Sequence, residues 1–388
     1  MNKVYLDNAA TTPLNEEVIE SMIAVMRNQY GNPSSIHSIG QEAKSLIEET
    51  RRNIAQHLGV TPKEIIFTSC GTESNNMIIK SSVEYLEVQR IISSPMEHKC
   101  VVETCLEMKN RKNVELVYVK HLKNGEVDIE HLEKLLQSSD KKTLVSLMHA
   151  NNEVGNLLDI DKVAQLCQKH NALFHSDTVQ TIGHLDLDFS KTLVDFASCS
   201  AHKFHGPKGV GFAFIRKTSG LKGLIVGGPQ ERSLRAGTEN VCGIVGLGKA
   251  LDISIQNLEK YQQYIRQIKD YAIEQLSQSF PKIKFNGNSA LADKSLYTVL
   301  NVALPFKNPL IGLQLDMKGI AVSQGSACSS GAGKPSMVLM MLQTEEEMDT
   351  TTPLRISFSH QTQKEDIDAL VNALEEIVSE NKIDIINH

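Results

Sequence analysis

The segment EIIFTSCGTESNN, residues 64–76, joins a short apolar run to a helix-like segment through Gly71. Similar apolar runs recur along the chain, at 64–69, 90–94, 114–119, 143–148, 172–176, 194–200 and 210–215. The first five alternate with helix-length segments, such as 159–170, whose apolar residues fall on one helical face. Strands that alternate with helices predict βαβ units around a mainly parallel sheet, an α/β fold. In such sheets functional residues follow the carboxyl ends of strands.

The pattern changes after about residue 250. A long polar helix is expected near 251–279 and an amphipathic helix from Lys364, with shorter strands and helices between them. We interpret this part as a smaller second domain. The length of 388 residues supports the division, because a chain of this size is too long for one hydrophobic core.

Composition excludes several classes of protein. Hydrophobic residues make up 41% of the chain, and the net charge of −6 gives no basic surplus for nucleic acid or an anionic membrane. The N-terminus lacks the apolar core of a signal peptide, and apolar runs such as 337–342 are too short to span a bilayer. Seven scattered cysteines without a CxxC pair argue against a zinc site or disulfides. We therefore expect a cytoplasmic protein with free thiols and no bound metal.

Two segments suit a phosphate group. Gly71 and Thr72 open a helix, whose unpaired N–H groups and dipole favour an anion, although a plain helix cap is the alternative. In SCSAHKFHGPKGVG, residues 198–211, Ser200 and His202 end a strand and could also bind phosphate. Neither G-x-G-x-x-G nor G-x-x-x-x-G-K-[ST] occurs, which removes the two commonest phosphate-binding alternatives on such a sheet.

Four residues that follow strands could bind an aromatic aldehyde. Lys203 meets a rigid Gly-Pro turn, and a desolvated lysine can form a Schiff base; the alternative is a surface lysine on a loop. Asp177 could keep a pyridine nitrogen protonated, with Gln180 bonded to the same ring, or it could be a cap or turn residue. His98 could stack on the ring and shuttle protons, or simply begin a helix.

Two further residues suit the chemistry of a substrate. Cys328 lies in SQGSACSSGAG, residues 323–333, where small neighbours leave the thiol accessible, so it is the best nucleophile candidate among the cysteines. Cys167 and Cys199 are expected in the core. Arg355 lies in the short apolar strand PLRISF, residues 353–358, and such an arginine needs a carboxylate partner, from the protein or from a substrate.

Together and in this order, these motifs resemble the cysteine desulfurases of the NifS/IscS type, within the class V aminotransferase superfamily of pyridoxal-5′-phosphate (PLP) enzymes. The resemblance covers nearly the whole chain. Its motifs are YLDNAATTP (5–13), GNPSSIHSIG (31–40), FTSCGTESNN (67–76), EHK (97–99), HANNEVG (149–155), SDTVQ (176–180), SAHKFHGPKGVG (200–211), ERSLRAGTEN (231–240), GSACSSG (325–331) and PLRISF (353–358).

The resemblance implies an aspartate-aminotransferase-like fold, the PLP-dependent transferase fold type I. A large domain would surround a mainly parallel seven-stranded sheet, and a smaller α+β domain would follow it. The implied boundaries are an N-terminal arm at 1–15 that is associated with the small domain, a large PLP-binding domain at 16–255, and a small domain with the Cys328 loop at 256–388.

The resemblance also implies a role for each candidate residue. Lys203 would hold PLP as a Schiff base, Cys328 would accept sulfur as a persulfide, and His98 would stack on the cofactor ring. Asp177 would bind the pyridine nitrogen of the cofactor, and Gln180 would bind its phenolic oxygen. The cofactor phosphate would be bound by Gly71, Thr72, Ser200 and His202, together with Thr238 from the neighbouring subunit of a homodimer. The substrate carboxylate would be bound by Asn152 and Arg355.

The implied activity is removal of sulfur from L-cysteine, with L-alanine as product. The persulfide would pass to an acceptor protein or thiol, for iron–sulfur cluster assembly or other sulfur trafficking. One alternative is a selenocysteine lyase or another PLP-dependent β-elimination on the same scaffold. A second alternative is a non-catalytic homologue that acts as a binding partner, against which the intact set of Lys203, Asp177 and Arg355 argues.

Overall fold

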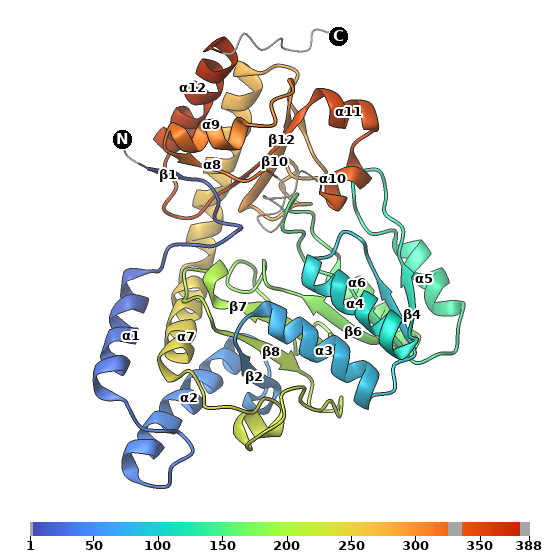
Figure 1. Ribbon diagram of the computed structural model, residues 1–388, viewed down its shortest axis with the longest axis vertical. Helices are drawn as coiled ribbons and strands as arrows, with labels where there is room; N and C mark the ends of the chain where they lie inside the picture. The colour runs from blue at the N-terminus through green and yellow to red at the C-terminus, as the bar shows by residue number, and fades with distance from the viewer. Residues whose placement is uncertain (1–2, 325–335, 381–388) are drawn as a thin grey trace.

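The computed structural model describes residues 3–324 and 336–380, so Cys328 lies outside the described residues. Its largest sheet has seven strands in the order β2-β8-β7-β6-β5-β3-β4 (Figure 1). The strands are β2 (Ile65–Thr68), β3 (Arg90–Ser93), β4 (Glu115–Tyr118), β5 (Thr143–Ser146), β6 (Leu173–Asp177), β7 (Phe196–Ser200) and β8 (Gly211–Ile215). Each of them falls on one of the seven apolar runs of the sequence.

Most neighbouring strands of this sheet are parallel. Strands β7, β6, β5, β3 and β4 run in one direction, whereas β8 is antiparallel to both β7 and β2. Strands β2, β3, β5, β7 and β8 are buried along their whole length, which explains why their sequences are continuous runs and not alternating patterns. The predicted α/β fold with a mainly parallel seven-stranded sheet is confirmed.

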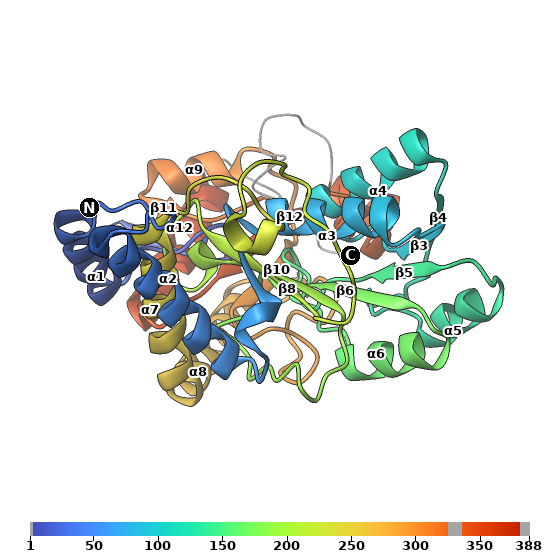
Figure 2. The same ribbon diagram turned by 90° about the horizontal axis from the view of Figure 1, so that it is seen from below.

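Helices cover both faces of the sheet. Figure 2 shows α3 and α4 on one face and α5 and α6 on the other, while α1 and α2 pack against α7. The helices are α1 (Glu16–Asn28), α2 (Ser38–His57), α3 (Gly71–Tyr85), α4 (Lys99–Lys112), α5 (Ile129–Gln137), α6 (Ile160–Lys169) and α7 (Val241–Gln256). Because α3 and α4 begin shortly after β2 and β3, their first turns lie at the carboxyl edge of the sheet.

The C-terminal part builds a second, smaller group of elements, at the top of Figure 1. It comprises β9 (Lys284–Phe285), β10 (Val299–Leu304), β11 (Ile320–Ala321), β12 (Thr352–Ser357), α8 (Leu258–Ser279), α9 (Ile311–Met317), α10 (Met337–Leu342), α11 (Glu345–Thr350) and α12 (Lys364–Glu380). Strands β12, β10 and β9 form an antiparallel sheet, and β1 (Val4–Tyr5) pairs in parallel with β11. The N-terminal residue Leu6 is fully buried in the same hydrophobic cluster as Ile356 and Leu370.

The helix expected near 251–279 is two helices, so this prediction was wrong in its bounds. Helix α7 ends at Gln256 and α8 begins at Leu258, with Asn257 between them. The Asn257 side-chain amide donates to the carbonyl oxygen of Ile253, and the Asn257 carbonyl accepts from the Tyr261 N–H. An asparagine that bonds locally to the backbone ends one helix and starts the next. The amphipathic helix from Lys364 is confirmed as α12. Within residues 3–324 and 336–380, no helix is both long and apolar enough to cross a membrane.

Candidate active site

A cavity of about 670 Å³ lies at the carboxyl edge of the large sheet, where β12 and the N-terminal segment meet it. Its lining brings together ten of the residues that the sequence predicts for the site: Gly71, Thr72, His98, Asn152, Asp177, Gln180, Ser200, His202, Lys203 and Arg355. The strands explain this meeting, because residues that follow β2, β3, β5, β6 and β7 all leave the sheet at the same edge.

The first turn of α3 has the features of an anion site. A β-carbon on Gly71 would lie 2.4 Å from Cγ2 of Val179 and 3.8 Å from Cβ of Ser200, so only glycine fits between them. Ser200, the last residue of β7, has a buried hydroxyl without a hydrogen-bond partner among the described residues. A buried hydroxyl beside the amino end of a long helix suits a bound phosphate.

Asp177 ends β6 in a buried network of hydrogen bonds. Its Oδ2 accepts from Nδ2 of Asn75 at 2.7 Å, and its Oδ1 accepts from the backbone N–H of Val179 at 3.0 Å. The Asn75 Oδ1 lies 3.1 Å from Nε2 of His175, which therefore donates. Burial lowers the pKa of His175 to about 4, so this imidazole is neutral at neutral pH. The network fixes the Asp177 carboxylate in one orientation.

Lys203 ends a short 3-10 turn, Ala201–Lys203, directly after β7. Its Nζ donates to the backbone oxygens of Ala9 at 2.7 Å and Ala10 at 2.8 Å. Nε2 of His184 donates to the Lys203 carbonyl oxygen at 2.9 Å, which holds the backbone of the turn. The lysine is half-buried in the cavity wall and is not the surface residue of the alternative interpretation.

His98 caps α4, as the alternative interpretation expects, and it also lines the cavity. Its stacking on a cofactor ring stays a prediction. Its Nδ1 accepts the backbone N–H of Cys100 at 3.2 Å and lies 2.9 Å from the Cys100 sulfur. Burial lowers the pKa of His98, which favours the neutral ring, and burial raises the pKa of the Cys100 thiol to about 12. With Nδ1 acting as the acceptor, the proton of the neutral ring lies on Nε2.

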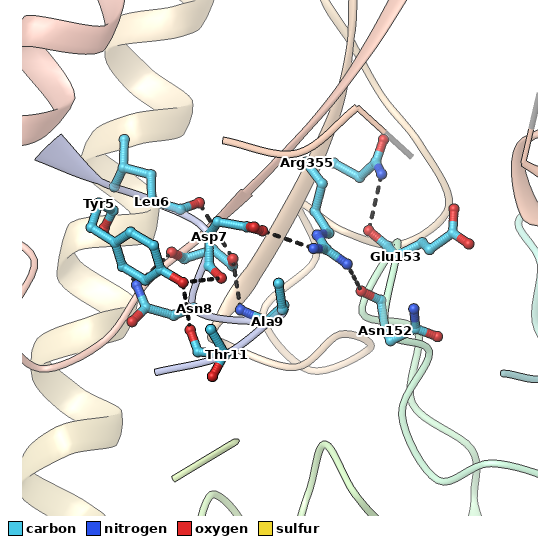
Figure 3. Close-up of polar contacts among 12 residues, drawn as sticks. Tyr5, Leu6, Asp7, Asn8, Ala9, Thr11, Asn152, Glu153 and Arg355 are labelled. Atoms are coloured by element: carbon cyan, nitrogen blue, oxygen red, sulfur yellow. Dashed lines mark hydrogen bonds and ion pairs between the residues drawn. The ribbon is translucent and has the colours of Figure 1, made fainter. Parts of the chain in front are cut away.

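Arg355 lies in β12 with only 2% of its surface exposed. Its Nη2 pairs with Oδ1 of Asp7 at 2.8 Å, and its Nη1 donates to the backbone oxygen of Asn152 at 2.9 Å (Figure 3). Its buried Nε has no hydrogen-bond partner among the described residues. The carboxylate partner thus comes partly from the protein, and only two of the five N–H groups of Arg355 are engaged by described residues.

The N-terminal segment contacts two more of the predicted residues. Nε2 of Gln180 donates to the Ala9 oxygen at 3.1 Å, and Nδ1 of His202 lies 3.1 Å from the Thr11 hydroxyl. Burial and, to a smaller extent, the positive charge of Lys203 lower the pKa of His202 to about 4. The ring is therefore neutral, and in that form it can act as either donor or acceptor.

Three residues of the site were missed in the sequence. Asn75 joins Asp177 to His175, Asp7 pairs with Arg355, and Glu97 lines the cavity with its Oε1 accepting the Met148 N–H at 2.7 Å. Burial, together with the nearby charge of Asp177, raises the pKa of Glu97 well above its usual value. Each belongs to a quoted motif, but only spatial contacts reveal its partner.

Thr238 is exposed and does not line the cavity of its own chain. Its neighbour Arg235 pairs with Glu73 in the first turn of α3 at 3.0 Å, which ties this loop to the rim of the anion site. That Thr238 reaches the site of a neighbouring subunit remains a prediction, as does the role of Cys328 outside the described residues.

The sheet, the cavity and the lysine at the end of β7 define the class of protein. The chain belongs to the Aminotransferase class-V family, which it matches over residues 4–370. It is 40% identical over 379 residues to the cysteine desulfurase IscS of Dictyoglomus turgidum. The matched region covers 97% of this chain and 94% of that protein. The fold is similar to a solved NifS-like protein, with a TM-score of 0.89 and 38% identity over 97% of this chain and 100% of the other. It is also similar to SspA in complex with cysteine, with a TM-score of 0.78 and 32% identity over 92% of this chain and 99% of the other.

Proposed function

We propose that the protein is a PLP-dependent cysteine desulfurase, which removes sulfur from L-cysteine and releases L-alanine. The observation that carries the proposal is the meeting of Lys203, Asp177 and Arg355 in one cavity at the carboxyl edge of the sheet. The names of the relatives, cysteine desulfurase IscS and SspA in complex with cysteine, support the same reaction.

The residues present fit PLP. The cavity of about 670 Å³ is within the usual range for a cofactor site. The Ser200 hydroxyl without a partner and the α3 terminus at Gly71 and Thr72 suit the phosphate, and the buried Asp177 carboxylate suits a protonated ring nitrogen. When bound, PLP supplies an electron sink that stabilises negative charge on the substrate Cα.

Each residue of the site then has its own role in the reaction. Lys203, whose Nζ donates to the oxygens of Ala9 and Ala10, would hold the cofactor aldehyde through Nζ. Once the substrate amine has displaced Nζ, the free lysine amine would take the Cα proton. Asp177, held by Asn75, keeps the proton on the ring nitrogen. His98 would lie against the cofactor ring and could move a second proton through Nε2, while Gln180 would bind the phenolic oxygen.

The substrate carboxylate binds beside Asn152 at Arg355, whose guanidinium keeps N–H groups that no described residue accepts. The sulfur then passes to Cys328. The Cys328 thiolate attacks the substrate sulfur, and the Cβ–S bond breaks as the S–S bond forms. Cβ then takes a proton and Cα regains the proton held by Lys203, which gives alanine. The persulfide on Cys328 passes its outer sulfur to an acceptor protein or thiol, for iron–sulfur cluster assembly or other sulfur trafficking. The proposal includes a cytoplasmic homodimer with Thr238 at the phosphate of the neighbouring subunit.

The test measures both products together. Purified protein with PLP, L-cysteine and dithiothreitol should release alanine and sulfide in equal amounts, and Cys328→Ser should lose both. Cys242→Ser, which changes a half-buried cysteine on α7, is the matched control and should keep the activity. Cysteine turnover that survives Cys328→Ser would contradict the persulfide route and favour a selenocysteine lyase or another β-elimination. Failure to bind PLP would favour a non-catalytic homologue.

A further inference from the structure

The N-terminal segment places a carboxylate beside the arginine of the site. The Ser357 N–H donates to the Leu6 oxygen at 2.8 Å, and the Asn8 side-chain amide donates to the Ser357 oxygen at 2.9 Å, so Asp7 is held against β12. Arg355 precedes Ser357 by two residues on that strand, so both side chains point to the same face. The Asp7–Arg355 pair is therefore fixed by backbone register and not by chance contact of two flexible side chains.

Tyr5 locks the turn that carries Asp7. Its hydroxyl donates to the backbone oxygen of Thr11 at 2.7 Å and also lies 3.2 Å from the backbone oxygen of Asp7 (Figure 3). The Ala10 N–H donates to the Asp7 oxygen at 3.0 Å. Burial, with a smaller contribution from Asp7, raises the pKa of Tyr5 to about 12, so the hydroxyl keeps its proton and stays a donor. The backbone that carries the Asp7 carboxylate is consequently fixed beside Arg355.

The two contacts of Arg355 engage two of its five N–H groups. Asp7 takes Nη2 and the Asn152 oxygen takes Nη1, whereas Nε is buried without a partner among the described residues. An unsatisfied buried donor is unfavourable, and in a cavity wall it indicates a ligand that accepts from it. Asp7 thus does two things at once: it orients the arginine, and it puts a negative charge close to the place where an anionic ligand would bind.

We propose that Asp7 is a positioning residue that tunes the carboxylate site: it holds Arg355 by Nη2 and leaves the unengaged N–H groups of the guanidinium for the ligand, and its charge weakens the affinity for anions. The identification of the ligand as an amino-acid carboxylate rests on the proposed function. A weakened anchor lets a small monocarboxylate product leave, because the repulsion from Asp7 acts on every anion at Arg355.

The test separates charge from position with two variants and two probes. Asp7→Asn keeps an oxygen for Nη2 but removes the charge, and Asp7→Ala removes both. Propionate and its neutral isostere propionamide are titrated into the PLP-loaded protein by calorimetry. Asp7→Asn should bind propionate about threefold to tenfold more tightly than wild type, with propionamide unchanged, since only the anion feels the lost charge. Asp7→Ala should bind propionate more weakly than Asp7→Asn.

Other outcomes overturn the proposal. An unchanged propionate affinity in Asp7→Asn, or an equal gain for propionamide, would show that Asp7 does not act on the anion. Equal propionate affinities of Asp7→Asn and Asp7→Ala would remove the positioning role. If neither variant folds, Tyr5→Phe loosens the same turn and keeps the charge, and it should weaken propionate binding; an unchanged affinity would then contradict the proposal.

Steady-state kinetics give a second readout. Asp7→Asn should lower KM for L-cysteine without raising kcat, because tighter binding of the carboxylate acts on substrate and product alike. An increase in KM would contradict the proposal. The propionate titration needs no turnover, so a protein that binds propionate as expected but does not desulfurate cysteine would overturn only the proposed function.

Discussion

The site has two halves that are built in different ways. The cofactor half comprises Asp177, Asn75 and His175, which lie on β6 and on the helix packed against the large sheet, and their hydrogen bonds satisfy one another. The carboxylate half joins Asp7 and Arg355, which are 348 residues apart in sequence, and it leaves a buried nitrogen unsatisfied. The hydrogen bonds of Asp177, Asn75 and His175 are complete before any ligand binds, whereas Arg355 keeps N–H groups for a ligand.

This difference has a physical basis. A ring nitrogen needs one fixed carboxylate, and a saturated network keeps that carboxylate in place without moving parts. A substrate that must enter and leave needs a donor that is not already occupied. Arg355, which would bind the exchanging ligand, therefore keeps open hydrogen-bond donors.

The largest effect is expected when Lys203 is replaced, because this residue would hold the cofactor and act on the substrate. Lys203→Ala should abolish the visible absorption band of bound PLP and lower cysteine turnover by at least about 10³-fold, because the covalent attachment and the Cα proton acceptor are lost together. Absorption spectra and alanine release measure this. Lys208→Ala, in the same loop but exposed, is the control and should keep both signals. A normal spectrum in Lys203→Ala would refute the assignment.

The sequence predicts the cofactor half better than the carboxylate half, because the residues of the cofactor half follow local sequence patterns. Strand ends, a glycine turn and a lysine after a strand are local patterns, so Gly71, Asp177 and Lys203 could be placed at one edge of the sheet without knowing the tertiary structure. The partner of Arg355 could not be identified, because no local pattern relates residue 7 to residue 355. The partner of Asp177 was missed because Asn75 reaches it only when α3 packs on the sheet.

The break between α7 and α8 was missed for a related reason. The apolar and polar residues continue in helical spacing through Asn257, whose backbone N–H and side-chain amide both donate to the Ile253 oxygen where the first helix ends. Helical periodicity predicts that a segment is helical, but it does not predict where a side chain bonds locally to the backbone.

A smaller effect is expected in the carboxylate half. Arg355→Lys keeps the positive charge but lacks the planar fork that reaches Asp7, Asn152 and a ligand together, so KM for L-cysteine should rise about 10- to 100-fold while PLP stays bound. Steady-state kinetics and the absorption spectrum measure the two halves separately. Arg111→Lys, in an exposed pair with Glu107, is the control. Loss of bound PLP in Arg355→Lys would mean that the halves are not independent.

The smallest expected effect concerns the protonation of Glu97, which lies near Asp177 in the cofactor half. Burial raises the pKa of Glu97 well above 4.5 in the folded protein, whereas an unfolded chain has the ordinary value. Between these two pKa values the folded protein holds one more proton than the unfolded chain. The free energy of unfolding from this group is therefore highest below pH 4.5 and is lost as pH rises through the folded pKa, by at most about 1.4 kcal/mol per pH unit.

Glu97→Gln stays neutral at every pH and should remove this contribution. Urea unfolding of wild type and variant at pH 5, 6, 7 and 8, with the same PLP concentration, should show a shallower decrease of stability with pH in the variant. Glu376→Gln, which breaks an exposed pair with Lys318, should keep the wild-type slope. Identical slopes for wild type and Glu97→Gln would mean that Glu97 is ionised beside Asp177. The cofactor half would then carry two carboxylate charges, and its contrast with the charge-paired carboxylate half would be lost.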